Sequence, residues 1–128
     1  MSDQEHAEEL LETARRDLRA LRAMDDREAF PDEIFGFHAQ QCVEKATKAW
    51  LAFLSRRYPH THDLQRLLDL LRENGIATDD LESFVDLNAF AVQYRYESLY
   101  TDEPEIDRSE LRAKIESFLT RVETAILR

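Results

Sequence analysis

The stretch FHAQQCVEKATKAW, residues 37–50, mixes apolar and polar side chains at the spacing of an α-helix. At about 100° per residue, the apolar side chains of this helix share one sector, which predicts a buried face. They are Phe35, Ala39, Cys42, Val43, Ala46, Ala49, Trp50 and Phe53. A narrow neighbouring sector holds His38, Gln41, Lys45 and Lys48, and the other flank holds Gln40, Glu44 and Thr47.

Apolar residues recur at helical spacing along the rest of the chain as well. We expect five helices, at about 3–24, 32–56, 61–74, 79–97 and 107–126, with a loop at 100–106. The expected N-caps are Asp32, Thr61, Thr78 and Asp107, and the pair Asn74 and Gly75 is a C-terminal cap. Pro59 should end the second helix, because proline disfavours helical geometry at the residue before it.

Composition narrows the fold class. The chain has 128 residues, which is typical of one domain spanning 1–128, and only two glycines and three prolines. An all-β fold needs more turn residues than these. The sequence therefore predicts an all-α protein, a five-helix antiparallel bundle of up-and-down character.

Charge and cysteine content exclude several classes of function. The net charge of −10 repels a phosphate backbone, so we expect no binding to duplex DNA. The single Cys42 cannot form an internal disulfide, which favours a reducing, cytoplasmic location. No signal peptide and no apolar run of membrane-spanning length is evident, so we expect no membrane association.

The sector with two lysines has two interpretations. Two ammonium groups beside the Gln41 amide are donors that suit a phosphate or a phosphate-bearing nucleotide. Alternatively, this sector is an ordinary solvated helix face, and Lys48 pairs with Glu44 of the other flank at i, i+4. In the fourth expected helix, Asn88 and Arg95 occupy positions where the apolar pattern continues, so both need polar partners. Those partners could belong to another helix, a second subunit or a ligand.

Three motifs resemble the HEPN family, the higher-eukaryote and prokaryote nucleotide-binding domain. They are the run FHAQQCVEKATKAWL, the run THDLQRLLDLL and the YRY of residues 94–96. The resemblance covers nearly the whole chain, although Glu97 stands where the family often has proline. It implies an antiparallel helical bundle, commonly dimeric, that works beside a small nucleotidyltransferase in two-component modules. Some of those modules are toxin–antitoxin pairs.

Many HEPN proteins are ribonucleases with an Arg-x(4–6)-His motif. Arg57 and His62 have this spacing here, but they straddle the expected helix break at Pro59. No histidine follows Arg95, and Tyr100 is a poor base at neutral pH. A metal site of His60 and His62, with His38 or Asp63, would rest on loop histidines alone, so we expect no metal.

We therefore predict a binding and interaction module without a cofactor. Its expected ligand-binding residues are His38, Gln41, Lys45, Lys48, Asn88, Arg95 and Tyr96. We expect a homodimer that covers apolar surface near Trp50 and Phe90, and a small nucleotidyltransferase as partner. The alternatives are a metal-independent ribonuclease toxin that uses Arg57 and His62, and a structural partner protein without a ligand.

Overall fold

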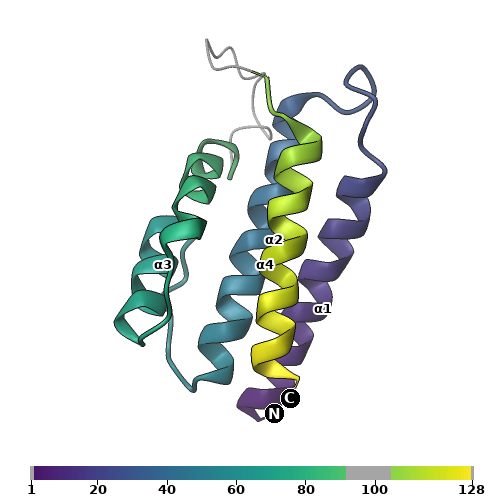
Figure 1. The fold of residues 1–128 in the computed structure, drawn as a ribbon. Helices are drawn as coiled ribbons and strands as arrows, with labels where there is room; N and C mark the ends of the chain where they lie inside the picture. Colours follow the sequence, from purple (N-terminus) through teal and green to yellow (C-terminus); the bar gives the residue numbers. More distant parts are fainter. Residues whose placement is uncertain (1, 92–104, 128) are drawn as a thin grey trace.

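A computed structural model describes residues 2–91 and 105–127 (Figure 1). Its element order is α1 (Asp3–Arg22), α2 (Asp32–Phe53), α3 (Leu64–Glu73), the 3-10 helix η1 (Asp79–Phe90) and α4 (Arg108–Ile126). The described residues contain no strand, so the prediction of an all-α, five-helix fold is confirmed. Within them, no helix combines the length and hydropathy that crossing a membrane requires.

The helix α2 lies at the centre of the bundle. It contacts α1, α3, η1 and α4, and its interface with α1 is the most extensive in the molecule. The helices α1, α2 and α4 lie side by side, and the start of α1 is close to the end of α4 (Figure 1). The side-chain amide of Gln4 donates to the carbonyl of Ile126 at 3.2 Å and joins those two ends.

Burial of α2 extends beyond the predicted face. Seven of its eight predicted core residues are buried, whereas Phe53, in the last turn, is 36% exposed. Gln40, Glu44 and Thr47 are also buried, although the sequence pattern assigned them to a polar flank. The reason is that a helix surrounded by partners has no solvated side.

The ends of the helices follow local capping rules. Asp107 accepts a hydrogen bond from the Glu110 backbone and caps α4, as predicted. The cap of α3 is Asp63 rather than Thr61, since the Asp63 carboxylate accepts from the Gln65 backbone. Asp32 is the first residue of α2 rather than its cap. Its carboxylate bonds Ile106 and Arg108 instead.

Two helices end earlier than predicted. The first stops at Arg22 rather than Met24, where the Ala23 backbone caps it. The second stops at Phe53 rather than Arg56, because Ser55 adopts a left-handed conformation with φ of 57°. The backbone of Ser55 then donates to Ala52, and that of Arg56 donates to Leu51. This is the Schellman arrangement, so the helix ends several residues before Pro59.

The fourth helix differs most from expectation. We predicted an α-helix from 79 to 97, but η1 is a 3-10 helix over Asp79–Phe90, and residues 92–97 lie outside the described range. Leu81, Phe84 and Leu87 are buried, at intervals of three residues. A 3-10 helix has three residues per turn, so this spacing places them on one face. Thr78 precedes η1 without a side-chain capping bond.

A buried arginine connects α4 to the rest of the bundle. Arg108 is 5% exposed, donates to the carbonyls of Met24 and Phe30, and pairs with Asp32 at 3.0 Å. Its guanidinium also lies 4.8 Å from the centre of the Phe35 ring. These contacts hold the first turn of α4 against the α1–α2 connection.

Candidate ligand-binding site

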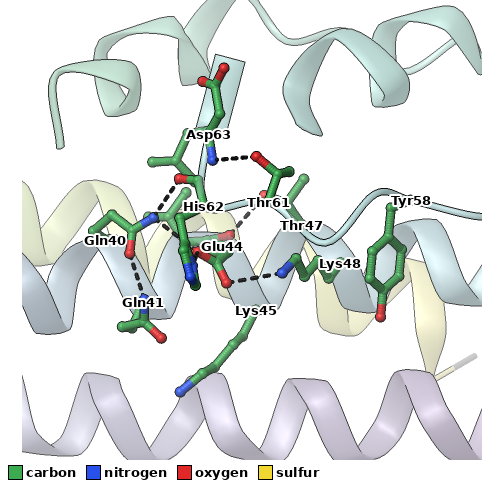
Figure 2. Close-up of polar contacts among 12 residues, drawn as sticks. Gln40, Gln41, Glu44, Lys45, Thr47, Lys48, Tyr58, Thr61, His62 and Asp63 are labelled. Carbon is green, nitrogen blue, oxygen red and sulfur yellow. Dashed lines mark hydrogen bonds and ion pairs between the residues drawn. The ribbon is translucent and has the colours of Figure 1, made fainter. Parts of the chain in front are cut away.

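A connected group of polar side chains lies where α2 meets the loop before α3 (Figure 2). The fully buried Gln40 donates to the backbone carbonyl of His62 at 2.9 Å and to Glu44 Oε1 at 3.0 Å. Gln41 donates to Gln40 Oε1 at 2.7 Å. The side-chain amide of Gln40 thus links α2 to the backbone of the loop before α3.

Glu44 is the centre of this group. Its side chain is 5% exposed, and it accepts from Gln40, from Lys48 Nζ at 3.0 Å and from His62 Nδ1 at 2.8 Å (Figure 2). A buried carboxylate is tolerated when it is paired and fully hydrogen-bonded, as it is here. Because Nδ1 of His62 faces this carboxylate, Nε2 is the ring nitrogen that is left to contact a ligand.

The two lysines of the predicted ladder have different partners. Lys48 pairs with Glu44, as the i, i+4 alternative predicted. Lys45 instead reaches α1 and pairs with Asp17 at 3.1 Å, and His38 Nδ1 lies 3.4 Å from the same carboxylate. Neither ammonium extends freely into water, since the side chains of Lys45 and Lys48 are only 25% and 14% exposed. Each positive charge already has a negative neighbour.

Aromatic contacts continue the group beyond Lys48. Its Nζ lies 5.6 Å from the centre of the Tyr58 ring, and the Tyr58 hydroxyl is 2.8 Å from His6 Nε2. Burial raises the pKa of Tyr58 above its usual value, so this hydroxyl keeps its proton at neutral pH. The first turns of α1 are thereby joined to the loop after α2.

Asn88, predicted to need a partner, has two on α3. Its side-chain oxygen accepts from the Leu64 backbone, and its amide nitrogen donates to Asp63, both at 2.9 Å. Asn88 therefore stabilises the start of α3 from η1. Arg95 and Tyr96 fall outside the described residues, so the structure does not test their place beside α2.

The remaining candidates do not assemble into a metal or nucleophile site. Within residues 2–91 and 105–127, no three His, Cys, Asp or Glu side chains gather closely enough to hold a metal. Cys42 is buried and lies 3.2 Å from the Ala14 carbonyl. Desolvation by burial raises the pKa of its thiol far above the usual range, so it is not a nucleophile.

Sequence reasoning missed the residues that organise the site. Gln40 and Glu44 were assigned to a solvated flank, and Asp17 was not considered. The i, i+4 spacing of Gln40, Glu44 and Lys48 was the available signal, since such side chains contact one another on a helix. Burial of the whole group could not be inferred without knowing that α3 and its loop cover this flank.

Comparison with known proteins identifies the family. The sequence model of the HEPN domain matches residues 7–125, so this chain belongs to the HEPN domain family. Among solved structures, an archaeal HEPN homologue superposes with a TM-score of 0.68 at 24% sequence identity. The match covers 94% of this chain and 98% of that one, and it supports the fold. A search of proteins with curated functions found no match.

Proposed function

We propose that this HEPN protein is a binding and interaction module that holds a phosphate-bearing nucleotide beside α2. The ligand would lie against Gln41, Lys48 and His62, next to the Lys45 and His38 pair with Asp17. Arg95 and Tyr96 remain proposed members of this site. No catalytic step is needed for this role, because the donors bind rather than transform the anion.

The observation that carries this proposal is the position of Glu44 between two donors. It holds Lys48 and His62 at 3.0 and 2.8 Å, so both side chains are oriented before a ligand arrives. An ammonium has three N–H donors, of which Glu44 takes one. Oriented donors reduce the entropy that binding must remove, which favours affinity at a site whose net charge is small.

Calorimetry with ATP and AMP tests the proposal. Replacing His62, which is 55% exposed, by Gln should weaken binding about tenfold, because one of the two side chains that Glu44 orients is lost. Lys48→Arg keeps the positive charge beside Glu44 and should retain most of the affinity. The matched control is Lys114→Arg, since Lys114 pairs with Glu110 at the same i, i+4 spacing on exposed α4. Absence of heat from wild-type protein at millimolar nucleotide would refute nucleotide binding.

The partner is proposed from family membership. We expect a small nucleotidyltransferase to bind this chain, as a two-component and toxin–antitoxin role would require. We also expect a homodimer. Trp50 would add little apolar area to its interface, since it is only 7% exposed and the Arg121 guanidinium lies 5.2 Å from its ring. Light scattering and co-purification with a nucleotidyltransferase from the same genome would measure both associations.

The pairing of His62 with Glu44 favours a second candidate, a metal-independent ribonuclease. A carboxylate that bonds Nδ1 orients the ring and leaves Nε2 for proton transfer. Arg57, five residues earlier, would stabilise the phosphate. Incubation with a mixed RNA pool should then give cleavage that His62→Ala and Arg57→Ala abolish. His60→Ala, a nearby exposed histidine, should leave cleavage intact. Intact RNA with wild-type protein would exclude this candidate.

A further inference from the structure

A second polar site exists where the start of α1 meets the residues after α2. A surface pocket of about 470 Å³ opens there, lined among others by Asp3, His6, Arg56, Arg57, Tyr58 and His60. Its volume falls within the roughly 300–1,000 Å³ of small-molecule sites. The pocket contains none of the residues named for the nucleotide site, so this inference is independent of that site, although Arg57 also belongs to the ribonuclease candidate.

Among the residues that the structure describes, the arginines of this pocket have no partner. Arg56 and Arg57 are exposed and, within residues 2–91 and 105–127, have no ion pair and no side-chain hydrogen bond. This is informative in a chain with 27 acidic and 17 basic residues, where a free cation would readily find a carboxylate. By contrast, Arg121 in the pocket beside Trp50 already bonds Asp80 and the Ala77 carbonyl.

The backbone holds the two arginines in place. The left-handed Ser55 turns the chain at the end of α2, and the backbone of Arg56 is bonded to Leu51 at 2.9 Å. Non-glycine residues in this conformation are strained and occur preferentially at functional sites. The strained turn therefore places Arg56 and Arg57 in the same pocket as Asp3 and His6, near the start of α1.

The opposite wall is ordered by an aromatic pair. The rings of His6 and Tyr58 are nearly parallel, with centroids 6.4 Å apart and planes inclined by 12°, and the Tyr58 hydroxyl lies 2.8 Å from His6 Nε2. A pocket lined by this pair and by two planar, five-donor guanidinium groups is suited to a multiply charged oxyanion. One phosphate can use one arginine, and two linked phosphates can use both.

We propose that this pocket binds a diphosphate group, either as free pyrophosphate or as part of a nucleotide, through Arg56 and Arg57. Asp3 is the carboxylate that opposes the anion, because it lines the same pocket. Removal of a positive charge and removal of a negative charge from this pocket should therefore change the affinity in opposite directions. Removing an arginine weakens binding, and removing the Asp3 charge strengthens it.

Calorimetry with inorganic pyrophosphate at low ionic strength tests this proposal. Arg56→Gln should weaken binding about tenfold, and the double variant with Arg57→Gln should abolish it. Asp3→Asn should strengthen binding by about threefold to fivefold, the effect of one nearby charge in water. Arg66→Gln is the matched control, because it removes the same charge from an exposed arginine on α3 that has no partner within residues 2–91 and 105–127.

The same calorimetry with ADP shows whether the pocket recognises a nucleotide or the diphosphate alone. ADP that binds more tightly than pyrophosphate indicates a nucleotide, and equal affinities indicate that the diphosphate alone is recognised; both support the pocket. No heat from pyrophosphate with wild-type protein, or equal weakening by Arg66→Gln, would overturn it. If Arg56→Gln removes pyrophosphate binding while His62→Gln leaves ATP binding unchanged, the pocket stands and the nucleotide site beside α2 fails.

Discussion

The Nδ1 atom of His62 lies 2.8 Å from the buried Oε1 atom of Glu44. This contact joins α2 to the loop before α3, two segments that the chain separates by 18 positions. Its chemistry resembles the orienting of an imidazole by a carboxylate in enzymes, but it also has a structural role. Glu44 is simultaneously the partner of Lys48 and Gln40, so removal of one member affects all of them.

The buried pair of Glu44 and Lys48 should be far more sensitive than an exposed pair at the same spacing. Lys48→Ala should lower the free energy of unfolding by about 3–5 kcal/mol, because it leaves a buried carboxylate without its main partner. The equivalent Lys114→Ala, which breaks an exposed pair with Glu110, should cost less than about 1 kcal/mol. Urea denaturation of both variants measures the difference. Equal losses of unfolding free energy in the two variants would show that burial of Glu44 does not strengthen its dependence on Lys48.

A methyl group at Gly36 should reverse the usual effect of glycine replacement in a helix. Alanine normally stabilises a helix interior by roughly 0.5–1 kcal/mol relative to glycine. Here an added Cβ would lie 2.5 Å from Cγ of Phe90, so we expect Gly36→Ala to destabilise the protein by about 1–3 kcal/mol. In a Phe90→Ala background the same change should stabilise it. Thermal denaturation of the four proteins gives the coupling, and no coupling would contradict the packing of η1 on α2.

Substitutions in the Schellman turns after α2 and α3 should change stability in opposite directions. Ser55 and Gly75 both have positive φ, at 57° and 83°, directly after a helix. A left-handed residue with a side chain costs roughly 1–2 kcal/mol, so Ser55→Gly should stabilise the protein by up to about 1 kcal/mol. Gly75→Ser should destabilise it similarly, since no steric neighbour lies within 4 Å to complicate the change. Chemical denaturation of both variants checks the signs.

Cys42 should resist thiol reagents in the folded protein. Burial raises the pKa of its thiol well above the ordinary value, and only the thiolate reacts. An ordinary thiol becomes more reactive as pH rises from 7 to 9, whereas Cys42 stays protonated, so its modification rate should remain close to zero. Unfolding the protein in guanidinium chloride should expose one fast-reacting thiol per chain, because the sequence has a single cysteine. The absorbance of the chromophore that the reagent releases measures the rate of modification. Rapid modification of the native protein would contradict the burial of Cys42.

Local rules in the sequence were sufficient to place the helices, although not to predict that the fourth is a 3-10 helix. The predicted cap at Asp107 and the C-terminal turn at Asn74 and Gly75 are present, because they depend on residues within a few positions of one another. The apolar stripe of α2 was predicted for the same reason. The errors at helix ends have local causes too. The left-handed Ser55 was not expected, since glycine is the usual residue there.

The sequence alone therefore determined the family, the helical class and the main core-facing stripes, because helix period and capping act between near neighbours. Only the tertiary structure decided which polar residues are buried. From the sequence, Gln40 and Glu44 belong to a polar flank, and only the packing of α3 and its loop on α2 shows that they are buried. Likewise, Lys45 was expected to be free to bind a ligand, whereas the fold pairs it with Asp17. Burial and pairing depend on segments that are distant in the chain, and the spacing within one helix does not encode what covers it.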